Sequence, residues 1–253
     1  TLVTSFGEYS RVFGTTFTSG STKQEFLTSL AVKSYFGQGG NSVLVTRVVT
    51  GTFSAATDTG ITAQSGSTPF TIDTLGKGTV FNSTSSLNAD GSLVNGTSDN
   101  IRYEISNINN SQGTFTLSVR RGDDNTKGKI ILESFNDLSL DPNSSNYIES
   151  VVGNQAISKV TDGDGSVYIS TVGEYVNRSK YIRISGVNRQ TLNYIGNDGL
   201  ISNGNLSGSL PAAQSGAFGT ATGTIDTSGN FFGDINNTDT QGLGDETGYA
   251  DAI

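Results

Sequence analysis

The chain has 253 residues, with 33 glycines, 3 prolines and a formal net charge of −8 at pH 7. It contains no Cys, His, Met or Trp, which excludes disulfides, Cys/His zinc sites, thiol nucleophiles and Ser-His-Asp triads. The acidic balance argues against direct binding of nucleic acid, and no apolar run approaches the roughly 18 to 20 residues that span a bilayer.

Two amphipathic helices are predicted at the start of the chain. The first begins at the capping box Ser5-Phe6-Gly7-Glu8, in which Glu8 can return a hydrogen bond to the backbone N–H of Ser5. Phe6, Tyr9 and Phe13 share one face of this helix, which we expect to lie in the core rather than in a ligand site. Gly14 ends it.

A second capping box is predicted at Thr22 with Glu25, and Gly37 is expected to end the helix that follows. Its buried stripe is expected to contain Phe26, Leu27, Leu30, Ala31 and Tyr35. Residues 43–49 are β-branched and apolar on both faces, which is typical of a strand covered on both sides of a sheet.

The middle of the chain has the pattern of a small β domain. Residues 50–68 are expected to form a linker, with a domain boundary near Gly60, and residues 82–100 a polar loop. Phe115, Leu117 and Val119 are expected to face the core of this domain. The predicted strands are residues 70–75, 101–105, 114–119 and 129–135.

A short helix is expected to start at Asp141-Pro142-Asn143 and to end at Gly153 or Asn154. The residues expected on one side of it are Tyr147, Ile148, Val151 and Val152. Strands are expected to resume at residues 167–169 and 181–184. The Gly-, Asn- and Ser-rich stretch 196–253 is expected to form long loops of marginal order.

The predicted fold class is therefore β-rich α+β, with a mixed α/β framework and an inserted antiparallel β domain resembling a barrel or a sandwich. We assign 1–60 to the first part of the framework, 61–140 to the inserted domain, and 141–253 to the return of the chain to a β-rich, loop-dominated framework.

Two ordered sets of motifs resemble the tail sheath proteins of contractile bacteriophages. The first runs from Ser5-Phe6-Gly7-Glu8-Tyr9 and Val12-Phe13-Gly14 through Phe26–Phe36 and Gly39-Gly40 to Val43–Val48. The second is Leu132–Pro142 followed by Asn146–Val152, which resembles the run of that family from its β domain into a helix. The resemblance covers roughly residues 1–190.

This resemblance implies a structural subunit of the virion and not an enzyme, with no cofactor, no metal and no catalytic residue. Such subunits surround the tail tube, assemble in the host cytoplasm and contract to drive the tube through the host envelope. The implied partners are neighbouring sheath subunits and the tube protein, without nucleic acid or membrane insertion. The chain is expected to be a fragment without the family's N-terminal arm and C-terminal domain, and to be monomeric in isolation.

Several local patterns could suggest chemistry. Asp162-Gly163-Asp164-Gly165-Ser166 begins like a calcium loop, but Gly173 stands where the bidentate Glu belongs, so a tight turn is the better interpretation. Arg120-Arg121, Asp123-Asp124 and Asp141 are interpreted as solvated charges around turns rather than a catalytic group.

Two further patterns are interpreted as structural or as chance matches. Gly37-Gln38-Gly39-Gly40 follows a helix and precedes a strand, so it is interpreted as a helix stop and not a phosphate loop. Asn82-Ser83-Thr84 and Asn95-Gly96-Thr97 fit the glycosylation pattern, which arises easily in this composition.

Two other function classes stay open. The Thr-, Ser-, Asn- and Gly-rich composition would suit a β-rich surface adhesin or carbohydrate-binding module, although the chain lacks the Trp that many sugar sites display. A glycan-cleaving enzyme needs only two carboxylates, and the chain has 23 acidic residues, but no pair of them stands out on neighbouring strands.

Overall fold

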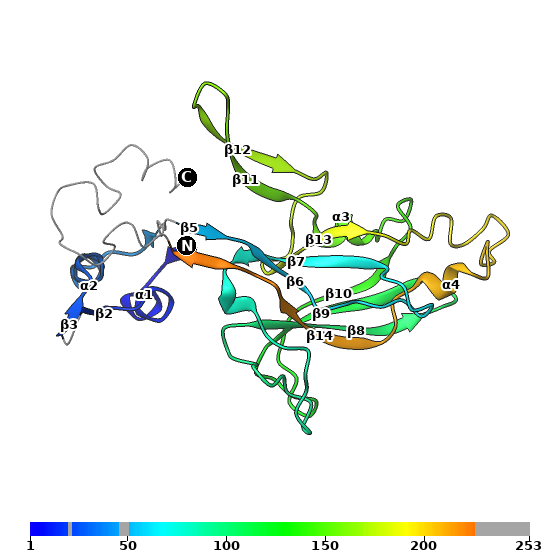
Figure 1. The fold of residues 1–253 in the computed structure, drawn as a ribbon, viewed down its shortest axis with the longest axis horizontal. Helices are drawn as coiled ribbons and strands as arrows, with labels where there is room; N and C mark the ends of the chain where they lie inside the picture. Colours follow the sequence, from blue (N-terminus) through cyan, green and yellow to red (C-terminus); the bar gives the residue numbers. More distant parts are fainter. Residues whose placement is uncertain (20–21, 46–50, 226–253) are drawn as a thin grey trace. The chain divides into compact units, whose positions relative to one another are not determined.

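The computed structural model describes residues 1–19, 22–45 and 51–225. The chain forms two compact units, one containing Thr1–Thr50 and the other Gly51–Thr224. Its class is β-rich α+β: strands dominate, and the helices are few and short (Figure 1). No helix in the described ranges is long and apolar enough to cross a membrane. Predictions for residues 46–50 and 226–253 lie outside the described residues.

The first helix of the first unit forms as predicted. Helix α1 (Phe6–Phe13) is capped by Ser5, whose Oγ accepts a 3.1 Å hydrogen bond from Glu8 N, and it ends at Gly14. Oε2 of Glu8 accepts from the backbone N–H of Thr4 at 2.8 Å. Tyr9 is buried, and its ring lies 5.2 Å from that of Phe13.

The predicted start of the second helix was wrong. Thr22–Glu25 forms strand β3, which pairs with β2 (Thr16–Ser19), so this backbone is extended where a cap was expected. Helix α2 (Leu27–Gly37) begins at Phe26 without a side-chain cap. The left-handed stop is Gly39, with φ +90°, rather than Gly37.

The predicted stripe of α2 was also wrong, because the helix turns a different face inward. Ser29 and Val32 are buried, and Phe36 packs against the small cluster formed by Val3, Tyr9 and Val32. The predicted stripe members Leu27, Leu30, Ala31 and Tyr35 are exposed.

The apolar strand after α2 is shorter in the structure than predicted. Strand β4 (Val43–Leu44) pairs antiparallel with β1 (Leu2–Val3), so that Leu2 lies opposite Leu44. Both leucines are exposed, which contradicts the expectation of cover on both faces within the described part of this strand.

The second unit is built on an antiparallel sheet that curls into a half-barrel (Figure 1). Its seven described strands follow the order β10-β9-β8-β14-β6-β7-β13. Their bounds are β6 Ala55–Asp58, β7 Phe70–Lys77, β8 Ile101–Asn109, β9 Thr114–Arg121, β10 Ile131–Ser139, β13 Ile182–Val187 and β14 Gln214–Gly219. A short 3-10 helix, η1 (Thr79–Phe81), follows β7.

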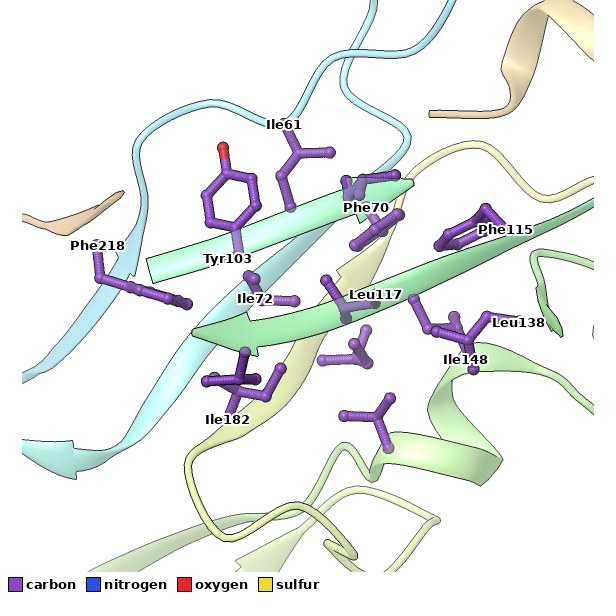
Figure 2. Packing of buried hydrophobic residues seen from close by; sticks show 14 of the residues in the cluster. Ile61, Phe70, Ile72, Tyr103, Phe115, Leu117, Leu138, Ile148, Ile182 and Phe218 are labelled. Carbon is purple, nitrogen blue, oxygen red and sulfur yellow. The ribbon is translucent and has the colours of Figure 1, made fainter. Parts of the chain in front are cut away.

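The core of this unit fills the concave side of the sheet (Figure 2). Phe115, Leu117 and Val119 alternate along β9 and are buried, as predicted. The rings of Phe70 and Phe115 stack with centroids 5.6 Å apart, which joins β7 to β9 across the core. Helix α3 (Ile148–Val152) contributes Ile148 and Val152.

Two segments predicted as irregular contain strands. The expected linker 50–68 contains β5 (Gly51–Phe53) and β6, and the expected loop region after residue 196 contains β14 and β15 (Gly223–Ile225). Strand β14 lies in the middle of the sheet, between β8 and β6. Its Ala217 and Phe218 side chains are buried.

Two helices of the second unit also differ from the prediction. Helix α3 begins after Tyr147 rather than near Asp141, and no side chain caps it. A single helical turn, α4 (Leu206–Ser209), interrupts the predicted loop ahead of β14. Gly153 ends α3, as expected.

At each edge of the curled sheet, a nearby segment of the same chain forms a backbone hydrogen bond with the edge strand. At β10, Ser139 N donates to Asn146 O at 2.9 Å, and at β13, Ile184 N donates to Gly153 O at 2.8 Å. A separate two-stranded ribbon, β11 (Ala156–Thr161) with β12 (Val167–Val172), projects from the sheet between α3 and β13 (Figure 1).

Candidate functional site

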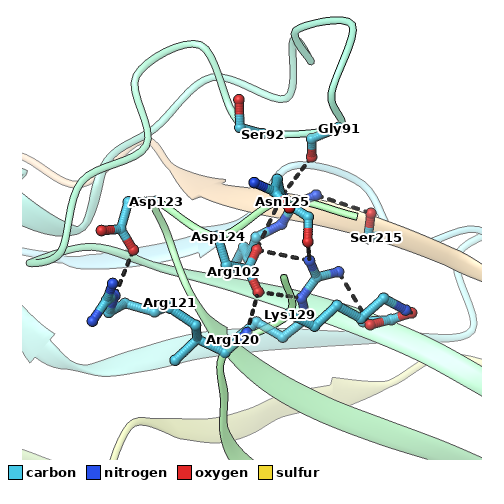
Figure 3. A network of polar contacts seen from close by, with 12 residues as sticks. Gly91, Ser92, Arg102, Arg120, Arg121, Asp123, Asp124, Asn125, Lys129 and Ser215 are labelled. Carbon is cyan, nitrogen blue, oxygen red and sulfur yellow. Dashed lines mark hydrogen bonds and ion pairs between the residues drawn. The ribbon is translucent and has the colours of Figure 1, made fainter. Parts of the chain in front are cut away.

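Two features stand out on the second unit: a buried cluster of charges and the projecting ribbon. The cluster lies on the face of the sheet opposite the core (Figure 3). Arg102 in β8 and Arg120 in β9 are cross-strand partners, and strand alternation sends their neighbours Tyr103 and Val119 into the core.

Asp124 is the acceptor that joins the two arginines. Its Oδ2 accepts from Arg120 Nε at 2.7 Å and its Oδ1 from Arg120 Nη2 at 2.7 Å, which is a bidentate pair. Arg102 Nη1 lies 3.4 Å from Asp124 Oδ1, and Ile130 N donates to Oδ2 at 2.9 Å. The side chains of Arg102, Arg120 and Asp124 are 1%, 3% and 0% exposed.

Loops and a second acid complete the cluster. Arg120 Nη1 also donates to Glu104 Oε2 at 3.1 Å, and Lys129 Nζ donates to Glu104 Oε1 at 2.6 Å. Arg102 also donates through Nη1 to Gly91 O at 2.9 Å and through Nη2 to Ser215 Oγ at 3.1 Å. The cluster therefore ties a loop after η1 and strand β14 to the β8–β9 pair.

The arrangement suits a group that stabilises the fold better than it suits a reactive site. Burial lowers the pKa of Arg102, helped by the neighbouring positive charge of Arg120, while Asp124 partly offsets this. Each carboxylate oxygen of Asp124 and Glu104 accepts a hydrogen bond, whereas Arg102 Nε is buried without a partner. Lys129, at 40% exposed, is the most accessible charge of the cluster, and it is paired with Glu104.

The prediction of solvated charges was wrong for Arg120 and Asp124 and right for their neighbours. Arg121 and Asp123 form a partly exposed ion pair, 39% and 33% exposed. Asp141 belongs to another set of contacts, where it accepts from Asn143 N at 2.9 Å and Tyr194 N at 3.2 Å. In the sequence, Arg102 and Arg120 alternate with core residues, a pattern that places them on the opposite face of the sheet but does not indicate their burial.

The calcium-like motif forms the tight turn that was predicted, at the tip of the ribbon. Asp162 N donates to Ser166 O at 2.8 Å, and Gly165 N donates to Asp162 O at 3.0 Å. Hydrogen bonds from Ser166 hold the pKa of Asp164 below its usual value. Among the described residues, no group of three or more Asp, Glu, His or Cys side chains is placed to hold a metal ion.

The first glycosylation pattern is part of the fold. The amide of Asn82 bonds the backbone of Ala221 in both directions, with Nδ2 donating to Ala221 O at 2.8 Å and Oδ1 accepting from Ala221 N at 2.9 Å. A sugar on this nitrogen would break the pairing. Asn95 is exposed, and its carbonyl accepts from Asn100 Nδ2 at 3.0 Å.

The ribbon is the more accessible feature, because it exposes large apolar side chains without covering any part of the sheet. Its exposed apolar residues are Ile157, Val167, Tyr168, Ile169 and Val172. Side chains of this kind gathered on one projection are typical of a protein-binding surface.

Comparison by sequence places this chain in no established family. No protein-family model matches it, and no curated protein matches it. Its function must therefore be argued from its own residues and fold.

Proposed function

We propose that this chain is a structural subunit of a contractile phage tail sheath, which surrounds the tail tube and contracts to drive it through the host envelope. The observation that carries the proposal is the order of elements. A capped helix, a second helix and a short apolar strand come first, followed by a large β unit, and this is the order that the motif resemblance implies.

The way the chain enters and leaves the second unit supports an inserted domain. Strand β5 at its start pairs with β15 at its end, and Ser54 N donates to Thr222 O at 3.0 Å. Adjacent entry and exit strands allow a domain to be inserted into another without disturbing it. The framework is then the unit that contains α1 and α2, and the insert is the curled sheet.

The chemistry of the described residues supports a mechanical role without catalysis. The centre of the most concentrated group of charges, Arg102, Arg120 and Asp124, is buried and joins loops to the sheet. In a sheath, free energy stored in a metastable array is released when rigid subunits repack. The proposed partners are neighbouring sheath subunits and the tube protein, and the proposed location is the virion tail.

Antibodies raised against the purified chain test this proposal. Immunogold labelling of contractile particles from the producing host should decorate the whole length of the sheath, in both extended and contracted tails. Antibody absorbed beforehand with the purified chain is the control and should leave the particles unlabelled.

Label confined to the capsid, the exposed tube or the tail fibres, or no label at all, would overturn the proposal. Fibre labelling together with binding of the purified chain to bacterial surface polysaccharide would instead support the adhesin hypothesis.

A further inference from the structure

The β11–β12 ribbon has apolar residues on both faces and covers neither. The register pairs Val160 with Tyr168 on one face and Lys159 with Ile169 on the other. Ile157 is 62% exposed and Tyr168 is 51% exposed. An isolated two-stranded ribbon is only marginally stable in water. A ribbon with both faces uncovered therefore suggests a binding partner.

Hydrogen bonds from asparagine side chains fix the base of the ribbon. Asn177 Oδ1 accepts from Gln155 N at 3.0 Å, and its Nδ2 donates to Gln155 O at 2.7 Å. Across the base, Asn154 Oδ1 accepts from Tyr175 N at 2.8 Å. Gly173, with φ +119°, packs so closely that a Cβ would lie 2.7 Å from Asn154 O. The ribbon is therefore held out as a defined projection.

The turn at the tip shows which backbone groups face outward. Asp162 N donates to Ser166 O, so this opposed pair is the last hydrogen-bonded pair of the ladder before the turn. Hydrogen-bonded and non-hydrogen-bonded pairs alternate along an antiparallel ladder. By this alternation, Val167, Ile169 and Thr171 direct their N–H and C=O groups away from β11, which leaves a free edge on β12.

The two edges of the ribbon differ in charge. Strand β11 carries Lys159 at an outward position, and a lysine on an edge strand discourages pairing. Strand β12, Val167–Val172, has no charged residue, and five of its six residues are β-branched or aromatic on exposed positions. Such a short, uncharged and β-prone segment pairs readily with another strand.

We propose that β12 pairs antiparallel with β12 of a second copy of this chain, across a two-fold axis. A copy presents the same uncharged edge, so neither strand meets an opposing charge. In parallel pairing, the bodies of both subunits would lie at the same end of two ribbons that are only about 5 Å apart, the spacing of neighbouring strands. In antiparallel pairing, the two bodies lie at opposite ends of the paired ribbons.

The aromatic residue of β12 favours one register. Centring the axis on Tyr168 pairs Val167 with Ile169 of the copy and brings the two Tyr168 side chains together. Cross-strand aromatic pairs are among the favourable contacts of a sheet.

This contact is small and closed. With the axis on Tyr168, residues 167–169 of the two β12 strands lie opposite one another over about 10 Å, and the buried area falls below the roughly 1,200 Å² of a stable interface, so the dimer should be weak and depend on concentration. An isologous contact does not propagate, whereas a sheath needs heterologous contacts. The inference therefore does not rest on the proposed function and can fail or succeed separately from it.

Because the chain has no cysteine, a single introduced thiol reports the pairing directly. Directly opposed residues of antiparallel strands have Cα atoms about 4.5 to 5.5 Å apart, within disulfide range. Under mild oxidation, Tyr168→Cys should form covalent dimers at least tenfold faster than Ile157→Cys. Ile157 is the matched control, since it lies on the other strand and is more exposed than Tyr168.

Equal rates for the two variants, after correction for labelling of each thiol by a maleimide, would overturn the proposal, as would faster crosslinking of Ile157→Cys.

A second pair of variants tests the edge without a thiol. Ile169→Pro removes an outward N–H while leaving the ladder to β11 intact, and Lys159→Pro does the same directly opposite on the β11 edge. Sedimentation equilibrium of the full chain, from micromolar to near-millimolar concentration, should show a rising mass for the parent and Lys159→Pro and a constant monomer mass for Ile169→Pro. A constant mass for all three, or an unchanged rise for Ile169→Pro, would refute the pairing.

Discussion

Glu133 in β10 accepts a 2.6 Å hydrogen bond at Oε2 from Ser179 Oγ, which lies just before β13. These two strands are the opposite edges of the curled sheet, so one carboxylate links both ends of the half-barrel. The same side chain accepts from Lys180 N at 2.9 Å through Oε1, and Ser179 Oγ in turn accepts from Ile182 N at 3.0 Å. The curl of the sheet is thus held by side chains where backbone pairing ends.

Replacing Glu133 by Ala should therefore destabilise the second unit by about 1 to 3 kcal/mol, because the buried hydroxyl of Ser179 and a backbone N–H lose their acceptor. Glu133→Gln keeps one acceptor oxygen and should cost less. Urea denaturation gives both values. Glu174→Gln, at an exposed position, is the control and should change stability by less than about 0.5 kcal/mol. Equal stability of Glu133→Ala and the parent would contradict this role.

The buried charge cluster predicts a larger effect. Asp124→Ala leaves the guanidinium groups of Arg102 and Arg120 buried without their shared acceptor, which typically costs about 3 to 5 kcal/mol. The neighbouring substitution Asp123→Ala breaks only a partly exposed pair with Arg121 and should cost at most about 1 kcal/mol.

Guanidinium chloride would screen these charges, so urea unfolding is the suitable measurement. A cost for Asp124→Ala no larger than that for Asp123→Ala would show that the cluster does not stabilise the fold.

The sequence was most informative where local pattern and tertiary packing agree. The alternation of Phe115, Leu117 and Val119 predicted a strand with one core face, and Ser5 predicted the start of α1, because each signal acts over a few residues. The prediction failed at Thr22–Glu25, where pairing with β2 replaced a locally plausible helix cap. The pairing of these two strands outweighs a helix cap, because a cap contributes only about 1 kcal/mol to stability.

Long-range partners also explain why the charge cluster could not be predicted. Asp124 looks like a turn residue in its local sequence, and its burial depends on Arg102, 22 residues earlier in another strand. Strand β14 was missed for a related reason. Its glycines lower its strand propensity, yet Gly216 is needed because the phenol ring of Tyr103 occupies the space that a Cβ would fill.

Gly216→Ala should accordingly destabilise the second unit by about 1 to 3 kcal/mol, the range typical of overpacking a core. The added methyl group would collide with the Tyr103 ring from the neighbouring strand β8. Combining it with Tyr103→Leu should cost less than the sum of the two single changes, since the smaller side chain relieves the collision. Gly204→Ala, where a Cβ would meet no atom within 4 Å, is the matched control for thermal unfolding. Strictly additive effects would contradict direct contact.

Tyr103 also makes stability depend on pH in alkaline solution. Burial raises the pKa of its hydroxyl well above the usual value of 10.0, with a further contribution from the charge of Asp58, while a hydrogen bond with Thr59 acts in the opposite direction. The folded state therefore keeps this proton after the unfolded state has lost it.

The stability that Tyr103 contributes is fully present below about pH 10 and is lost as pH rises from there through the raised folded-state pKa, at about 1.4 kcal/mol per pH unit. Tyr103→Phe removes the titrating group and should flatten the decline in urea stability above pH 10 relative to the parent, although it lowers stability at neutral pH. Tyr168→Phe, on the exposed ribbon, is the control and should leave the slope unchanged. Identical slopes for the parent and Tyr103→Phe would show that this hydroxyl ionises as easily in the folded chain as in the unfolded one.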